Sequence, residues 1–352
     1  MDFPSVVALH TGVPAQCYRQ DEIADYYMRL VDSGGSRRER AIRAIINASG
    51  VECRHSVVEA AFFEQPKTTQ QRNDRYMSEA LALGRRVVAE GLAKAGVAPR
   101  DITNLIVVSC TGFSIPGLDL LLAHELGMRA QLKRACVLGM GCYGAFPGIR
   151  LARESITAQP GGLALVLALE LCTLHLQFDS SVETIVSTSL FADGAGMMLV
   201  GGEKAQTGSP ALIDHETYCD YQTLDHMSFT VTDQGFYMSL SSYVPDVLAA
   251  NVEAFVGRLL SRHNLCREDV KFWAIHPGSK KIVEHIQAQL ALSDEQVRYS
   301  LDVLKHYGNM SSATVLFVLH CMMASGAPQA GDYGVMMAFG PGLTMEALLV
   351  RW

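Results

Sequence analysis

The sequence lacks long hydrophobic runs, basic clusters and closely spaced cysteine pairs. Its strongest apolar runs, residues 163–169 and 313–319, are followed by Glu170 and His320. Both runs are far shorter than the ~20 residues that cross a bilayer. The first residues, Met1 to Pro4, carry no positively charged side chain and do not resemble a signal peptide. We therefore expect a cytoplasmic protein without a membrane span.

Positive charge is also scarce. The 29 Lys and Arg residues are outnumbered by 36 Asp and Glu residues, which gives a net charge of −7 with His neutral. Nucleic-acid-binding proteins carry a basic surplus, so we expect no nucleic-acid partner. With 49% hydrophobic and 18% charged residues the chain is not disordered. Its 352 residues suffice for two domains or one large two-lobed body.

The nine cysteines are scattered, odd in number and form no CxxC pattern. We therefore expect neither a disulfide framework nor a metal site. The pattern is typical of reduced thiols in the cytosol. For each cysteine the alternative to a functional role is that of a small buried hydrophobic residue.

Strands and helices alternate along the chain. Apolar spacing predicts helices over residues 37–46 and 73–95, and buried strands over residues 102–109, 132–138, 163–169 and 190–200. Residues 201–210 are the best linker candidate, and beyond them strands are expected at 270–275 and 333–339. This alternation predicts mixed α/β layers.

Cys142 lies where a strand turns sharply into a helix. Gly139, Gly141 and Gly144 surround it, and glycines permit a tight turn and the close approach of a substrate. A thiol at a helix N-terminus is expected to favour the thiolate, so Cys142 is a candidate nucleophile. The alternative is a buried cysteine beside a structural turn.

His276 and Asn309 occupy similar positions. His276 ends an apolar strand before Pro277 and Gly278, and Asn309 follows Gly308 at the start of an apolar helix. Taken alone, each could be structural, as a hydrogen-bonded histidine or a helix cap. Together with Cys142 they supply a nucleophile, a base and donors for an oxyanion, which is the chemistry of acyl transfer.

Six blocks of this chain resemble those of type III polyketide synthases, the chalcone-synthase-like family of the thiolase superfamily. The blocks are Cys110–Gly117, Gly141-Cys142, Leu190–Gly194, Phe272–Gly278, Tyr307–Ala313 and Ala338–Thr344. The blocks occur in the same order as in the family. Where this chain departs from the plant pattern, as with Cys110 in place of Thr, it resembles the bacterial members.

The resemblance implies an α/β thiolase fold of two fused αβαβα halves forming a five-layered core, with residues 1–205 as the N-terminal half and 206–352 as the C-terminal half. It implies a homodimer. It also implies acyl-CoA and malonyl-CoA as substrates, with no cofactor and no metal. Cys142 would carry the starter acyl group, while His276 and Asn309 would promote decarboxylation of malonyl-CoA and stabilise the enolate. A cationic His276 would also lower the pKa of the thiol.

The resemblance further implies roles for residues around the catalytic three. Phe191 and Met238 would form a gate between the CoA tunnel and the cavity, with Met238 standing where Phe is usual. The residues that would line or shape the cavity are Cys110, Thr111, His175, Phe229, Ser311, Pro341 and Gly342. Ile115 would enter the partner's cavity. Arg43, Arg54 and His55 would contact CoA, or else belong to a solvated charged face.

The product remains open at this point. We expect iterative condensation on a fatty-acyl starter and cyclisation to an alkylpyrone or alkylresorcinol. One alternative is a malonyl-only synthase that makes phloroglucinol or tetrahydroxynaphthalene. Another is a ketoacyl synthase III-like enzyme that uses an acyl carrier protein. A Cys/His hydrolase and a catalytically inactive scaffold of the same fold are less consistent with these residues.

Overall fold

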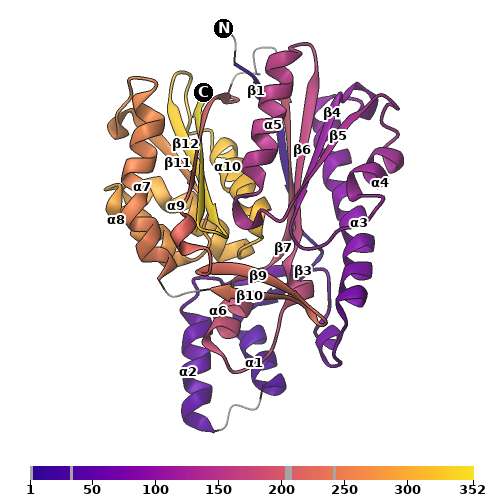
Figure 1. Cartoon of the computed structure of the whole chain (residues 1–352), viewed down its shortest axis with the longest axis vertical. Coiled ribbons are helices and arrows are strands. Elements are labelled where there is room, and N and C mark those ends of the chain that lie inside the picture. The colour runs from indigo at the N-terminus through magenta and orange to yellow at the C-terminus, as the bar shows by residue number, and fades with distance from the viewer. Residues whose placement is uncertain (1–2, 32–34, 203–207, 241–242) are drawn as a thin grey trace.

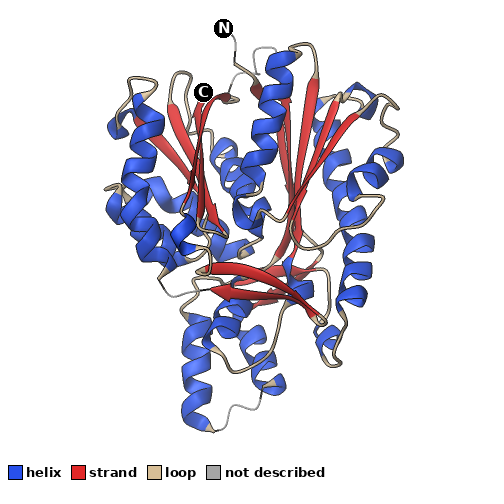
Figure 2. Cartoon of the chain, viewed as in Figure 1, coloured by secondary structure: helices blue, strands red, loops and turns tan. Residues whose placement is uncertain are grey.

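The computed structural model describes residues 3–31, 35–202, 208–240 and 243–352. Its core has five layers, in which helices lie outside and between two groups of strands (Figures 1 and 2). This is the mixed α/β, thiolase-like arrangement that the sequence predicts. Both termini lie at the same end of the molecule, and α1 (Gln20–Leu30) and α2 (Ser36–Asn47) project from the opposite end.

The strands form one hydrogen-bonded sheet of nine, in the order β11-β12-β13-β8-β1-β7-β6-β4-β5. The group on the N-terminal side contains β1 (Ser5–Gly12), β4 (Asn104–Ser109), β5 (Lys133–Leu138), β6 (Leu163–Leu171) and β7 (Asp193–Gly201). The other group contains β8 (Ala211–Cys219), β11 (Val270–Ile275), β12 (Tyr333–Gly340) and β13 (Thr344–Arg351). The groups meet where β1 and β8 pair at Ser5 and Ala211.

The two strand groups repeat one pairing pattern. In the first group β4 pairs parallel with β6, β6 antiparallel with β7, and β7 antiparallel with β1. In the second, β11 pairs parallel with β12, β12 antiparallel with β13, and β13 antiparallel with β8. The expected boundary between residues 205 and 206, and part of the 201–210 linker, lie outside the described residues.

Two buried helices form the middle layer. They are α5 (Ala145–Ala158) and α10 (Thr314–Ala324), and both contribute to a core cluster that also contains strands of both groups. α10 presents apolar side chains such as Val315, Leu316 and Phe317 in several directions, as expected for a helix covered on all sides. Because α5 and α10 share this layer, the loops that lead into them lie close together.

The outer layers are built from helices that cover the outward faces of the two strand groups (Figure 1). On one side lie α3 (Thr69–Ala95) and α4 (Leu118–Glu125), and on the other α7 (Val244–Ser261), α8 (Lys280–Gln289) and α9 (Asp294–Tyr307). Near the projecting end lie α6 (Val182–Leu190) and two short sheets, β2 (Gln16–Arg19) with β3 (Cys53–Ser56), and β9 (Met227–Thr232) with β10 (Gly235–Leu240). No helix in the described ranges is both long and apolar enough to span a membrane.

Candidate active site

Cys142 lies in a short 3-10 turn, Gly141–Tyr143, directly before α5. Gly141 has φ 68°, and a Cβ there would lie 2.6 Å from Cδ of Pro341. Both the backbone angle and the close contact therefore require glycine. The packing of Pro341 against this turn fixes the position of the buried Cys142 thiol.

His276 follows the last residue of β11, and its N–H donates to the Met337 carbonyl at 2.8 Å. The side chain is 1% exposed. Neither ring nitrogen has a hydrogen-bond partner within the described part of the chain. Burial lowers the pKa of His276 to about 3, so the imidazole is neutral, with one N–H to donate and one nitrogen to accept.

Asn309 is held by its own side-chain bonds just before α10. Its Oδ1 accepts from the N–H of Ser311 at 2.8 Å, and its Nδ2 donates to the Gly278 carbonyl at 3.1 Å. These bonds assign the amide orientation. The second N–H of Nδ2 remains available to the Cys142 sulfur or to a bound substrate. Ser311 adopts φ 48°, a strained conformation of the kind that clusters at functional sites.

The electrostatics of Cys142 differ from the sequence-based expectation. Burial raises the pKa of the thiol to about 11, and hydrogen bonds with Ser311 and Asn309 only partly oppose that rise. The expectation of a thiolate beside a cationic histidine is therefore wrong for the unliganded site. Desolvation outweighs the helix N-terminus, and it favours the neutral thiol and the neutral imidazole together.

Cys142, His276 and Asn309 all line one cavity of about 520 Å³, here called the outer cavity. Its walls are mainly apolar, with Val182, Val186, Leu190, Met227, Val244, Pro245, Ile282 and Phe339. Lys280 and Lys281, from the start of α8, also line it. Neither lysine was predicted as a site residue, although both lie within five residues of His276.

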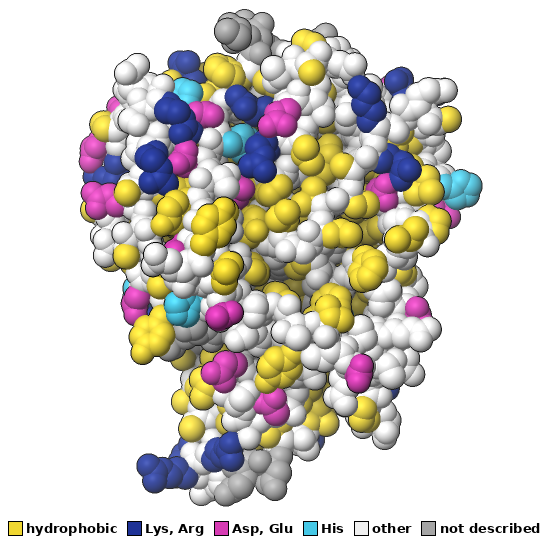
Figure 3. Space-filling view, in the orientation of Figure 1, with side chains coloured by type: hydrophobic (Ala, Val, Ile, Leu, Met, Phe, Trp, Pro, Cys, Tyr) yellow, Lys and Arg dark blue, Asp and Glu magenta, His cyan; other side chains and the backbone are white. Residues whose placement is uncertain are grey.

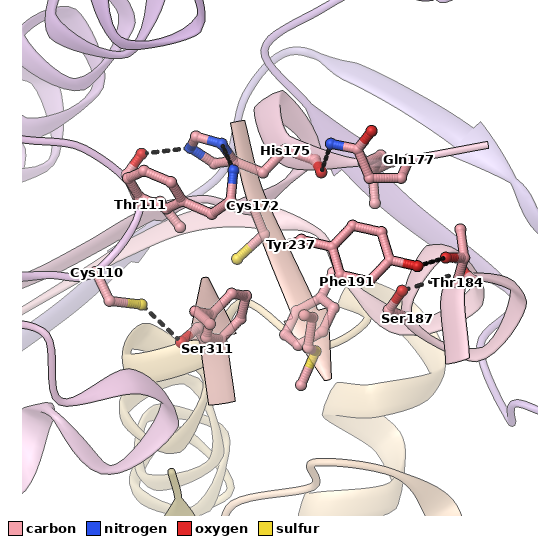
Figure 4. A pocket seen from close by; sticks show the side chains of 14 residues that line it. Cys110, Thr111, Cys172, His175, Gln177, Thr184, Ser187, Phe191, Tyr237 and Ser311 are labelled. Carbon is pink, nitrogen blue, oxygen red and sulfur yellow. Dashed lines mark hydrogen bonds between the residues drawn. The ribbon is translucent and has the colours of Figure 1, made fainter. Parts of the chain in front are cut away.

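A second, much smaller cavity of about 40 Å³ lies beyond it, here called the inner cavity (Figure 4). Phe191 and Met238 line both cavities. The structure thus places the two expected gate residues between the chamber with the catalytic groups and the inner one. Cys110, Thr111, His175, Phe229 and Ser311 line the inner cavity, as expected, together with Cys172, Leu176, Gln177, Thr184, Ser187, Phe236 and Tyr237.

His175 is a fixed wall of the inner cavity. Its Nε2 lies 2.8 Å from the Thr111 carbonyl, and the N–H of Phe236 donates to its Nδ1 at 3.1 Å. The ring stacks on Phe236 with centroids 4.2 Å apart. Burial lowers the pKa of His175 to about 4. Because both nitrogens are engaged, this histidine shapes the cavity and has no free nitrogen for proton transfer.

Glu170 was missed as a site residue, although its interruption of an apolar strand was a signal. Its carboxylate is fully buried and accepts from Ser312 Oγ at 2.6 Å, Thr111 Oγ1 at 2.7 Å and the Cys110 N–H at 3.0 Å. Burial raises the pKa of Glu170. Ser312 precedes α10 whereas the other donors follow β4, so Glu170 joins the two sides of the site.

An apolar face lies next to the inner cavity. Ile115 is 96% exposed and Phe113 is 58% exposed. Near them a third cavity, of about 410 Å³, is lined by Leu138, Leu224, Phe229 and Val231, with Pro341 and Gly342. Figure 3 shows apolar side chains gathered around a hollow in the middle of one face of the molecule. Pro341 and Gly342 line this third cavity together with Gly141, and neither lines the inner cavity. They therefore lie behind the Cys142 turn.

The three expected CoA contacts do not line the outer cavity. Arg43 pairs with Asp25 at 2.7 Å and with Glu39 at 3.3 Å. His55 stacks near Tyr307, with its Nδ1 2.8 Å from the Pro14 carbonyl. Arg54 is 2% exposed, and its Nη1 donates to the Phe191 carbonyl at 2.8 Å. Arg54 therefore contacts the backbone of Phe191, one of the two expected gate residues.

Two sequence models of one family match nearly the whole chain. The model of the N-terminal domain of chalcone and stilbene synthases matches residues 3–204, and that of the C-terminal domain matches residues 220–352.

The relatives align over nearly the whole of this chain. A 1,3,6,8-tetrahydroxynaphthalene synthase of Streptomyces peucetius subsp. caesius is 31% identical, with 99% of this chain and 93% of that protein covered. The alpha-pyrone synthesis polyketide synthase-like Pks18 of Mycobacterium tuberculosis is 31% identical over 98% of this chain and 91% of its own length. The crystal structure of 1,3,6,8-tetrahydroxynaphthalene synthase from Streptomyces coelicolor superposes with a TM-score of 0.93 at 28% identity, over 99% of each chain.

Proposed function

The chain belongs to the chalcone and stilbene synthase family and is a type III polyketide synthase, and we propose that it extends an acyl starter on Cys142 with malonyl-CoA. The observation that carries this proposal is that Cys142, His276 and Asn309, all three buried, line one largely apolar cavity. Together they supply a nucleophile, a neutral base and an amide donor.

In the first step Cys142 attacks the thioester carbonyl of the starter. Because the resting thiol is protonated, His276 accepts its proton as the sulfur–carbon bond forms. The tetrahedral intermediate then collapses, CoA leaves as its thiolate, and the proton on His276 passes to that sulfur. The acyl group stays on Cys142, and His276 returns to its neutral form.

In the second step malonyl-CoA loses CO₂ and becomes an enolate. The protonated nitrogen of His276 and the second N–H of Asn309 donate to the thioester oxygen as negative charge develops there. The enolate carbon attacks the acyl carbonyl on Cys142, and the Cys142 sulfur leaves as a thiolate, which takes up from solvent the one proton that this condensation consumes. The product is a β-ketoacyl-CoA that is longer by two carbons, which can reload Cys142 for another round.

Lys280 and Lys281 are the CoA contacts that we propose in place of Arg43, Arg54 and His55. Both line the outer cavity, and Lys280 has a partner in Glu284 at 3.6 Å. Ammonium groups at a cavity wall suit the phosphates of CoA. The chemistry of the three catalytic side chains needs no metal or further cofactor. The nine free thiols fit a cytoplasmic location, where CoA thioesters are used.

For the product, we propose an alkylpyrone or alkylresorcinol from a fatty-acyl starter. The apolar lining of the outer cavity and the flexible Met238 at the gate support this choice. A malonyl-only synthase, which would make phloroglucinol or tetrahydroxynaphthalene, is the second candidate. It is favoured by the inner cavity, whose 40 Å³ holds only a few water molecules.

We also propose a homodimer formed through the apolar face of Phe113 and Ile115. An isoleucine that is 96% exposed beside an open apolar cavity is what a partner surface would cover. Replacing Ile115 with Asp should raise the dimer dissociation constant by at least about tenfold, because a charge would be desolvated at the interface. Sedimentation velocity measures this, with Phe3→Asp as the matched control.

The deciding experiment is mass spectrometry of products from purified enzyme, malonyl-CoA and one starter at a time. Starters are acetyl-CoA, medium-chain and long-chain acyl-CoA, aromatic acyl-CoA and none. Cys142→Ala is the blank. Pyrones or resorcinols that grow with the starter support the first product class, and a product from malonyl-CoA alone supports the second. Turnover with carrier-protein thioesters only would overturn the CoA-dependent reaction.

A further inference from the structure

The short sheet of β2 and β3 lies directly behind the gate and the segment that carries Asn309. Arg54, on β3, donates to the Phe191 carbonyl at 2.8 Å. A Cβ added at Gly308, the residue before Asn309, would lie 3.3 Å from the Cβ of Arg54. The strand β3 therefore packs against both a gate residue and the approach to a catalytic residue, so a shift of this strand would move both.

Hydrogen bonds also fasten β3 to the C-terminal end of α9. The N–H of Glu52, just before β3, donates to the Lys305 carbonyl at 2.8 Å. The Cys53 thiol, on β3 itself, donates to the His306 carbonyl at 3.1 Å. The helix α9 ends at the next residue and leads directly into the segment of Asn309. The Cys53 thiol is thus one of the groups that fix the end of α9.

A second thiol, that of Cys17 on β2, lies on the same face of this sheet as Cys53. The strands are antiparallel, with Cys17 opposite His55 and Arg19 opposite Cys53. Residues that stand opposite one another share a face, as do alternate residues of one strand, so the two thiols are diagonal neighbours within reach of each other. Burial raises the pKa of Cys53 to about 11, and a hydrogen bond and charge repulsion from the Cys17 thiol add to that rise. The two sulfurs therefore interact directly.

The two thiols differ in their access to solvent. Cys17 is exposed, whereas Cys53 is partly buried. An oxidant from solvent therefore meets Cys17 first, and Cys53 lies beside it as a second thiol that can resolve the product. Neither cysteine lines the outer or the inner cavity, so the acyl-transfer reaction assigns this pair no role.

We propose that Cys17 and Cys53 form a reversible disulfide with glutathione disulfide as the oxidant, and that this disulfide slows polyketide formation. First the Cys17 thiolate attacks one sulfur of glutathione disulfide, and one glutathione leaves as its thiolate. The Cys53 sulfur then attacks the Cys17 sulfur and displaces the second glutathione. The two cysteines thus lose two electrons to the glutathione disulfide, and their two protons end on the two released glutathione thiols. Such disulfides are transient in the cytosol, as a switch requires.

The disulfide acts on the reaction through the end of α9. Once Cys53 is bonded to Cys17 it has no S–H for the His306 carbonyl, and its sulfur turns toward β2. The contacts that β3 makes with Gly308 carry this change to Asn309. Because a misplacement of about 1 Å can cost about 100-fold in rate, we expect malonyl-CoA decarboxylation to fall by at least about tenfold. This consequence rests on the proposed function, whereas formation of the disulfide does not.

The test compares the purified full-length enzyme after incubation with reduced or with oxidised glutathione. Free thiols are then alkylated, and the protein is digested with trypsin without reductant. Cys17 falls in the peptide of residues 1–19 and Cys53 in that of residues 44–54, and each peptide contains one cysteine. We expect mass spectrometry to find the two peptides joined only in the oxidised sample. Product formation in that sample should be at least about tenfold lower and should recover with dithiothreitol.

Cysteine variants assign the effect to this pair. Cys17→Ser and Cys53→Ser should both lose the joined peptide, and Cys17→Ser should keep the same activity in either form of glutathione. Cys266→Ser, which removes another exposed thiol, is the matched control and should respond as the wild type does. Absence of the joined peptide, or an equal dithiothreitol-reversible loss of activity in Cys17→Ser, would overturn the proposal. A joined peptide in an enzyme that makes no polyketide from any CoA thioester would contradict the proposed function instead.

Discussion

Phe191 and Asn309 are joined through the backbone. The N–H of Asn309 donates to the Leu190 carbonyl at 2.8 Å, and its carbonyl accepts from the N–H of Ala192 at 2.9 Å. The two residues thus pair like neighbouring parallel strands, one from each side of the site. This pairing holds Phe191, a gate residue, and Asn309, an oxyanion donor, at a fixed separation. The donor therefore needs little reorganisation when negative charge develops on the substrate oxygen.

Asn309→Ala should separate the two half-reactions. Loss of the Nδ2 donor should lower malonyl-CoA decarboxylation and product formation by about 100-fold or more, because the enolate oxygen loses one of its two donors. Acylation of Cys142 by the starter should persist, and intact-protein mass spectrometry detects the added acyl mass. Asn251→Ala, on α7 and outside the cavities described, is the matched control. Unchanged CO₂ release in Asn309→Ala would remove this residue from the reaction.

The pH dependence of Cys142 alkylation should reflect a buried neutral thiol. Burial raises the pKa of Cys142 from 9.0 to about 11, so the rate with iodoacetamide should keep rising through pH 9.0 because only the thiolate reacts. Peptide mass spectrometry follows the Cys142 peptide, and free glutathione gives the reference profile. A rate that is already constant near neutral pH would instead indicate a thiolate–imidazolium pair with His276.

Replacing Met238 with Phe should narrow the range of starters. Met238 lines both catalytic cavities, and a stiff ring would remove the adaptability of the thioether. We expect kcat/KM for long-chain acyl-CoA to fall by about tenfold relative to short-chain acyl-CoA. Product profiles over a chain-length series measure this. Met128→Phe, which lies just beyond α4, is the control, and an identical profile in both variants would place Met238 outside the gate.

The catalytic positions could be found in the sequence because each has a local signature. Cys142, His276 and Asn309 follow apolar strands or precede apolar helices, with a glycine within two residues, and the helices α2 and α3 were likewise predicted from periodicity. Their convergence depends on α5 and α10 sharing one buried layer. That arrangement follows from pairing between strands distant in the chain, which local patterns do not encode.

Other features could not be read locally. The strand β1 was not predicted, because its sequence shows little alternation of apolar and polar residues. Its pairing partner β7 lies about 190 residues away in the chain, so no nearby segment indicates the pairing. The resemblance implied a CoA contact for Arg54, whereas the fold buries this arginine against the Phe191 carbonyl; a local sequence pattern does not show which arginine is buried. The raised pKa of Cys142 depends on how deeply the finished fold buries it, so the helix N-terminus alone predicted the wrong direction.

His215 should make the fold sensitive to acid. Neither ring nitrogen has a partner among the described residues, and burial, with Arg153 and Arg150 nearby, lowers its pKa from 6.5 to about 3. Between about pH 3 and pH 6.5, His215 is therefore protonated in the unfolded chain and neutral in the folded chain. Because protonation then favours the unfolded state, the free energy of unfolding falls as pH drops below 6.5.

His215→Leu removes that titration without leaving a polar group unpaired. At pH 5 the substitution should therefore avoid a loss in the free energy of unfolding on the order of 2 kcal/mol. Urea unfolding at neutral pH and at pH 5, at equal protein concentration, should show a smaller drop in the free energy of unfolding for His215→Leu than for the wild type. His175, His276 and His320, whose pKa values are also lowered by burial, should contribute to the remaining drop. An equal drop in both proteins would mean that His215 is protonated as readily in the fold as in the unfolded chain.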